Sequence, residues 1–408
     1  MLCCVSSGLC CAGEVACSTL CCLCSLCGLT PRNFSKVAYV FLDLAFVGVS
    51  IALMFTLQPL FERYDFLQCN SESGGGDSCL GTAAVLRMSF VLFLFHLTLL
   101  VVMLPRCECS AIIHNGCWCA KVLVIIAAYV AVFWIPNSFY WGWAHFARAV
   151  SGIYLIIQVA LLIVAAFTIN DKLVAAYESQ RNICAAITLV LLTFLFTGGT
   201  IAFQVMQYIW FHSCGGTLAI TIVTTVVTVI FYGLNLLKSR SDGSIFTASL
   251  VSAYVSYIGW SAMASVPDQE CNPFVDSLDN FISQLVIGAT FTFLSLFETA
   301  SMIQSEGDSS GRQIVAEAED TEKNPETGNF PVSKQNLVFQ AIVLIATLYY
   351  PMLITNWGDP IVNSDRSDFF KANWASFWVK IAAQWACMLL YLWSLVAPMI
   401  CKGRDFTS

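Results

Sequence analysis

The chain has 408 residues, of which 58% are hydrophobic and only 11% are charged, and its formal net charge is −7. Soluble domains are about one-quarter charged, so this composition excludes an ordinary water-soluble globule and indicates a membrane protein. The sequence contains no glycine-rich phosphate loop, HExxH motif, nucleophile elbow or catalytic-triad spacing. We therefore expect a protein that is not an enzyme and that binds no cofactor, metal or nucleic acid.

Apolar blocks of roughly twenty residues, long enough to cross the hydrocarbon core as helices, recur about ten times along the chain. Because these blocks show no period-two alternation, helices are favoured over the strands of a barrel. The predicted fold class is all-α, a polytopic membrane protein of about ten transmembrane helices. The predicted spans lie near Val37 to Leu57, Thr82 to Leu104, Gly116 to Ile135, Phe139 to Ile169, Ile183 to Phe211, Gly216 to Leu237, Ile245 to Ala264, Leu278 to Ala300, Leu337 to Trp357 and Trp374 to Ile400.

A cysteine-rich segment, residues 1–30, precedes the first span, and nine of the 20 cysteines lie within its first 28 residues. One interpretation is S-acylation, which would anchor the segment in the membrane interface. The alternative is an additional apolar helix that uses cysteine as a small hydrophobic residue. The S-acylation candidates are Cys3, Cys4, Cys10, Cys11, Cys21 and Cys22.

The loop after the first span, QCNSESGGGDSC, contains Cys69 and Cys79 in a polar, glycine-rich stretch. The loop is short and is expected to face an oxidising compartment, so we predict a disulfide there, with two free thiols as the alternative. A second cysteine cluster, CECSAIIHNGCWC, has spacings that resemble zinc ligation. Its paired cysteines are one residue apart rather than two, and we expect no metal.

The stretch from about 139 to 180 has no proline and no strong turn signal, so it predicts one helix of about forty residues. At 1.5 Å per residue such a helix would be roughly 60 Å long, about twice the hydrocarbon thickness, and would have to tilt or protrude. The alternative is a break near Asn170. Predicted helices one to eight occupy residues 36–302 in total.

Residues 303–335 are acidic, nearly free of aromatic residues and contain two prolines, which predicts a disordered cytosolic loop. Two further spans occupy 336–400, and residues 401–408 form a short cytosolic tail. Most lysines and arginines between spans fall on the side shared by both termini, so the positive-inside rule places both termini in the cytosol. The host membrane would be the plasma membrane or an endomembrane.

Ionisable side chains inside the predicted spans are the best pointers to function, because a charge facing lipid costs several kcal/mol. We expect five of them to line a groove for lipid or substrate: Asp43, Arg87, Arg148, Glu298 and Lys380. The alternative is that Asp43 with Arg148, or Glu298 with Lys380, form structural ion pairs that lock helices together.

Four segments distributed along the chain resemble the serine incorporator family, also called Serinc or TMS membrane proteins. They are HNGCWCAK (114–121), YIGWSAMASVPDQECNP (257–273), LITNWGDP (353–360) and FWVKIAAQWACMLLYLWSLVAP (377–398). The resemblance implies a ten-helix fold in which a long diagonal helix separates two bundles. It also implies a role in incorporating serine into phosphatidylserine and sphingolipids, together with transbilayer phospholipid movement.

A lipid-handling membrane protein is therefore the expected function, with membrane phospholipids as partners. A groove beside the long helix would admit headgroups, and Arg87, Arg148 and Lys380 would meet their phosphates. One alternative is a secondary transporter for serine or another small polar solute, with Asp43 or Glu298 as a proton or cation site. Another is a scaffold for lipid-synthesis enzymes. Serine, such enzymes and a second copy of the chain are the further candidate partners.

Overall fold

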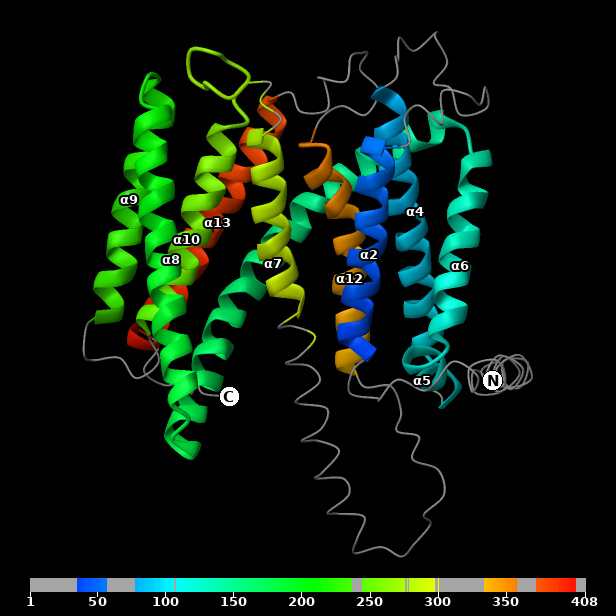
Figure 1. Cartoon of the computed structure of the whole chain (residues 1–408), viewed down its shortest axis with the longest axis horizontal. Coiled ribbons are helices and arrows are strands. Elements are labelled where there is room, and N and C mark those ends of the chain that lie inside the picture. Colours follow the sequence, from blue (N-terminus) through cyan, green and yellow to red (C-terminus); the bar gives the residue numbers. More distant parts are fainter. Residues whose placement is uncertain are drawn as a thin grey trace, which may run out of the picture. The chain divides into compact units, whose positions relative to one another are not determined.

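The computed structural model describes residues 35–56, 78–105, 108–236, 244–275, 277, 279–297, 300, 334–357 and 372–400. These residues form helices and no strands, which confirms the all-α prediction. The cysteine-rich segment, the acidic loop and the cytosolic tail lie outside them. The helices in Figure 1 are α2 (Ser35–Thr56), α4 (Ser78–Met103), α5 (Glu108–Asn115), α6 (Trp118–Ala131), α7 (Asn137–Gln180), α8 (Ile183–Trp210), α9 (Gly215–Leu236), α10 (Ile245–Met263), an unlabelled helix (Asp279–Phe297), α12 (Lys334–Ile354) and α13 (Trp374–Ile400).

Nine helices in the described part of the chain are long and apolar enough to cross a membrane. A helix satisfies its backbone hydrogen bonds internally, which hydrocarbon requires of any spanning segment. α8 has the character of a lipid-facing helix most clearly, since only 6% of the residues in its most apolar stretch are buried. Its Phe194 and Leu195 are largely exposed, as expected of side chains that contact acyl chains. The fold is that of a polytopic membrane protein.

The third predicted span is shorter than its neighbours, because the apolar helix there covers only Trp118–Trp134. Cys117 precedes it with a φ of 60°, a left-handed conformation that a helix cannot include. At the other end a 3-10 turn, Val132–Trp134, leads into an extended Ile135. Pro136 follows, and the residue before a proline is biased away from the helical region toward the extended one. At 1.5 Å per residue this helix is about 25 Å long.

α7 is one uninterrupted helix of 44 residues, where the sequence predicts a helix from about 139 to 180. It has no break at Asn170, and at 1.5 Å per residue it is about 66 Å long. The helix ends where Arg181 adopts a φ of 47°. The side chain of Asn182 then accepts a hydrogen bond from the backbone N–H of Cys184 and caps α8.

The chain divides into two compact units. The first contains α2, α4, α5, α6, residues 137–151 of α7 and most of α12. Within it, α4 packs against α2, α5 and α6. Hydroxyl groups on α4 and α7 bond to α12, since Ser89 donates to the carbonyl of Thr347 and Ser151 to that of Leu348.

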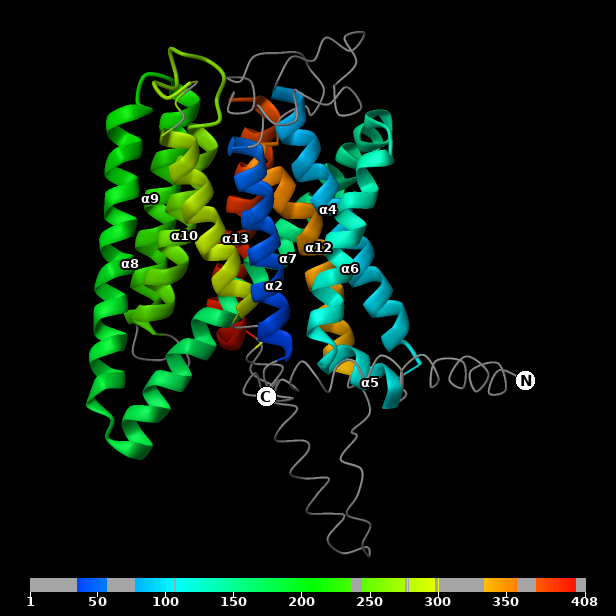
Figure 2. The ribbon, with the colours of Figure 1, turned by 45° about the vertical axis from the view of Figure 1, so that its right-hand side comes forward.

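The second unit is built around α10. In the most apolar stretch of this helix, 94% of the residues are buried. α8, α9 and α13 pack against α10, and both views show these four helices side by side (Figure 1, Figure 2). No hydrophobic driving force brings helices together within a membrane. Small residues allow close packing there, because they let the helix backbones approach each other. On α10 they include Ala248, Ser252, Ala253, Ser256 and Gly259.

Candidate functional site

Lys380 on α13 is the centre of a polar cluster in the second unit. Its ammonium donates to the side-chain oxygens of Ser265 (2.8 Å), Gln284 (3.0 Å) and Asn356 (3.2 Å) and to the backbone carbonyl of Ser261 (3.3 Å). Ser376 joins the same network. We call these six residues the Lys380 cluster.

The cluster brings together four separate parts of the chain. Ser261 belongs to the last turn of α10, and Ser265 to the turn that follows it. Gln284 is on the helix Asp279–Phe297. Asn356 follows the end of α12 and has a φ of 48°, a left-handed conformation that asparagine tolerates better than most residues.

Asn356 lies in the left-handed turn that ends α12. The backbone N–H of Trp357 donates to the carbonyl of Met352 at 2.9 Å, five residues earlier, as in a Schellman motif. The amide of Asn373 donates to the carbonyl of Asn356 at 2.9 Å, which ties this turn to the start of α13. The position of Asn356 is therefore fixed by both neighbouring helices.

A second set of hydrogen bonds orients the oxygens that face Lys380. Ser261 donates to Gln284 Oε1 at 2.7 Å, and Tyr257 donates to the backbone carbonyl of Gln284, also at 2.7 Å. Ser376 donates to Asn356 Oδ1 at 3.0 Å. These partners hold the side chains in place around the ammonium, which gives the cluster a defined geometry.

The electrostatics of the cluster are unusual, because all four acceptors of Lys380 are neutral oxygens. No carboxylate of the described residues lies within ion-pair distance of its ammonium. The residue as a whole is half-buried. Lys380 lies six residues after Trp374, the first residue of α13, which is about 9 Å along the helix axis. An unneutralised cation at this depth is suited to binding an anionic group.

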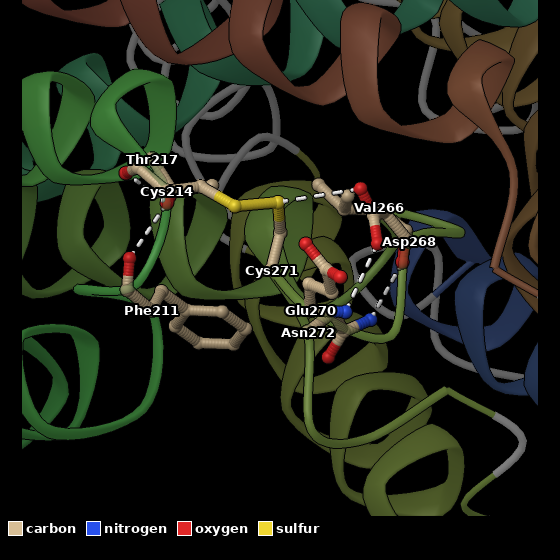
Figure 3. The surroundings of a disulfide bond; sticks show 8 residues. All are labelled: Phe211, Cys214, Thr217, Val266, Asp268, Glu270, Cys271 and Asn272. Atoms are coloured by element: carbon tan, nitrogen blue, oxygen red, sulfur yellow. Dashed lines mark hydrogen bonds between the residues drawn. A yellow bond between two sulfur atoms is a disulfide. The ribbon is translucent and has the colours of Figure 1, made fainter.

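Figure 3 shows a disulfide between Cys214 and Cys271. Cys271 lies in the loop that follows the turn with Ser265. The disulfide joins the short α8–α9 connection to the loop after α10. Within that loop, Asn272 donates to the carbonyls of Ala264 (2.9 Å) and Val266 (2.8 Å). The covalent link and the asparagine together fix the loop beside the cluster.

Two of the predicted site residues, Asp43 and Arg87, belong to the first unit and contact specific residues there. Asp43 on α2 lies 2.9 Å from Nε2 of His96 on α4. Arg87 on α4 is buried, with its guanidinium 5.1 Å from the ring centroid of Phe133 and 4.6 Å from that of Tyr140. Cation–π contacts of this kind stabilise a buried arginine.

The remaining predicted site residues are placed only in part. Arg148 is half-buried on α7. Glu298 and Cys69 lie outside the described residues, as do the side chain of Cys79 and the six S-acylation candidates. The described residues contain no group of three or more His, Cys, Asp or Glu side chains that could hold a metal ion. The groove, disulfide and acylation assignments at these positions stay predictions.

Sequence reasoning missed the Cys214–Cys271 disulfide and the partners of Lys380. Both cysteines fall in loops predicted on the same side of the membrane, which is the signal that could have paired them. The resemblance to serine incorporators offered a second signal. Three of its matching segments supply Ser261, Asn356 and Lys380, which meet in the cluster.

Comparisons with known proteins identify the family of this chain. The family model described as serine incorporator (Serinc) matches residues 9–336 and 298–404. A probable serine incorporator of Nematostella vectensis is 27% identical over 451 residues, covering 97% of each chain. Serine incorporator 2 of Mus musculus is 28% identical and that of Homo sapiens 27%, each covering 96% of this chain and 99% of the relative. The chain belongs to the serine incorporator family.

Proposed function

We propose that this protein handles phospholipids without catalysing a reaction, by letting headgroups move between leaflets while acyl chains stay in the bilayer. In this role it supports the incorporation of serine into phosphatidylserine and sphingolipids. The observation that carries the proposal is the Lys380 cluster, in which a half-buried lysine has only neutral acceptors among the described residues.

The chemistry of the cluster suits a serine headgroup. A phosphate oxygen can replace one neutral acceptor of Lys380, so that the charged donor then meets an acceptor of opposite charge. The amide oxygens of Gln284 and Asn356 can accept from an ammonium group, while the hydroxyls of Ser265 and Ser376 can donate to a carboxylate. The cluster thus offers partners for each charged group of phosphatidylserine.

The orientation proposed for the protein has both termini in the cytosol and the Lys380 cluster at the exoplasmic end of its helices. The distribution of lysine and arginine supports this orientation. The Cys214–Cys271 disulfide supports it independently, because disulfides persist in oxidising compartments and both cysteines lie at the end assigned to the exoplasmic side. Headgroups would then enter or leave the cluster at the outer leaflet.

Leaflet exchange by the purified full chain tests this proposal. Vesicles are prepared with fluorescent phosphatidylserine in both leaflets, and a membrane-impermeant reductant bleaches the outer leaflet. We expect bleaching to exceed half of the signal in vesicles that contain the protein and to stop near half in empty ones. Bleaching that stops near half in both would contradict leaflet exchange. Uptake of labelled serine by the same vesicles would then favour the transporter.

A further inference from the structure

The first unit contains a buried polar chain of three residues from three helices: Asp43 on α2, His96 on α4 and Gln340 on α12. His96 Nε2 lies 2.9 Å from Asp43 Oδ1, and Gln340 Nε2 lies 2.6 Å from His96 Nδ1. His96 and Gln340 are fully buried, whereas 17% of the Asp43 side chain is exposed. These three residues therefore run from a partly exposed carboxylate to an enclosed amide.

In the present orientation of the Gln340 side chain, its amide nitrogen faces the imidazole. An amide nitrogen only donates, so Nδ1 of His96 must accept from Gln340. The ring proton then resides on Nε2 and is donated to Asp43. This arrangement contains a neutral imidazole and an ionised carboxylate.

In this state one atom of the three residues Asp43, His96 and Gln340 has no hydrogen-bond partner among the described residues. Oε1 of Gln340 is buried and accepts no hydrogen bond. A buried polar atom that makes no hydrogen bond destabilises the folded state. If the side-chain amide turns over, Oε1 faces Nδ1 instead, and that contact is favourable only when Nδ1 carries a proton. The unpartnered oxygen is thus an acceptor for a second ring proton.

We propose that Asp43, His96 and Gln340 form an intramembrane proton-binding site. One proton enters past the exposed edge of Asp43 and binds the imidazole, giving an imidazolium between the Asp43 carboxylate and Gln340 Oε1. No other atom is gained or lost. Because the three residues come from α2, α4 and α12, the protonation state is linked to the packing of these helices.

The charged and titratable neighbours are consistent with a single added proton. Tyr39 on α2 presents its ring to His96 at a centroid distance of 5.9 Å, and His114 of α5 stacks on Tyr39 at 5.1 Å. Burial, followed by Lys121 on α6, Lys36 on α2 and His96, lowers the pKa of His114 to about 3. His114 therefore stays neutral above that pH, and Asp43 supplies the negative charge beside the imidazole.

Histidine-specific nitrogen NMR of the full chain in lipid discs tests this proposal, because the chain has only 4 histidines. His96→Gln identifies the His96 signals, and single variants of the other three identify them by elimination if it fails to fold. Between about pH 8 and 5, where histidines commonly titrate, we expect His96 to change from a neutral ring with the proton on Nε2 to an imidazolium. The His114 signals should not change.

Asp43→Asn removes the countercharge and should abolish the His96 transition over this range. His145→Gln, a change at an exposed histidine, is the matched control and should leave the transition intact. A wild-type His96 that stays neutral, or stays an imidazolium, throughout the titration would overturn the proposal, and so would a transition unaffected in folded Asp43→Asn. The site is independent of the proposed lipid exchange, because this readout requires no transport activity.

Discussion

Replacing Lys380 with methionine is expected to slow leaflet exchange at least about tenfold. Methionine keeps a long unbranched side chain but removes the ammonium that would meet the headgroup phosphate. Loss of one charge-assisted hydrogen bond, worth about 1.5–3 kcal/mol, corresponds to a fall of roughly tenfold to a hundredfold. The initial rate of outer-leaflet bleaching in reconstituted vesicles measures the effect.

The matched control for this experiment is Lys172→Met, the same substitution at an exposed lysine on α7. It should leave exchange unchanged. Lys380→Met also leaves the oxygens of Ser265, Gln284 and Asn356 without their donor, so thermal unfolding must be measured in parallel. Lys380→Arg keeps the positive charge and should retain part of the activity. Normal exchange by folded Lys380→Met would show that the ammonium has no role.

Gly288→Ala is expected to destabilise the second unit. A Cβ atom at this position would lie 2.6 Å from the hydroxyl of Tyr257 and 3.1 Å from Cδ1 of Leu353. The hydroxyl cannot move freely, because it is attached to a buried ring and donates to the carbonyl of Gln284. Overpacking of this kind costs about 1–3 kcal/mol, which exceeds the gain of up to about 1 kcal/mol in helix propensity. The midpoint of thermal unfolding in detergent measures the change.

Gly233→Ala is the matched control, since this glycine of α9 is exposed and a Cβ atom there would meet nothing within 4 Å. It should be neutral or stabilise the protein by up to about 1 kcal/mol. Removing the obstructing hydroxyl with Tyr257→Phe should recover part of the stability lost in Gly288→Ala. Equal unfolding midpoints for the two glycine variants would contradict the close contact described here.

The helices were predictable because hydrocarbon imposes a strong and local requirement on the sequence. A spanning helix needs about twenty apolar residues, and such blocks can be read without knowledge of tertiary structure. The length of α7 followed from the lack of proline between 139 and 180. The shortness of the third helix was harder to predict, because the left-handed Cys117 at its start has no strong sequence signal.

The contacts of the candidate site were not predictable in the same way. Gln284, Asn356 and Lys380 are far apart in the sequence, and no local pattern indicates that they meet. The pairing of Asp43 with His96 and that of Cys214 with Cys271 depend likewise on how helices pack. Twenty cysteines allow far too many pairings for spacing to decide between them. Sequence analysis could therefore identify Lys380 as an unusual residue but could not supply its surroundings.

The most direct test of the central claim is a density map of the full chain in lipid discs that contain phosphatidylserine. If the Lys380 cluster binds headgroups, the map should show a phospholipid phosphate within hydrogen-bond distance of Lys380, with its headgroup near Gln284 and Asn356. The same map from discs of Lys380→Met should lack this density. A wild-type map in which only protein oxygens surround the ammonium, despite abundant phosphatidylserine, would contradict the account.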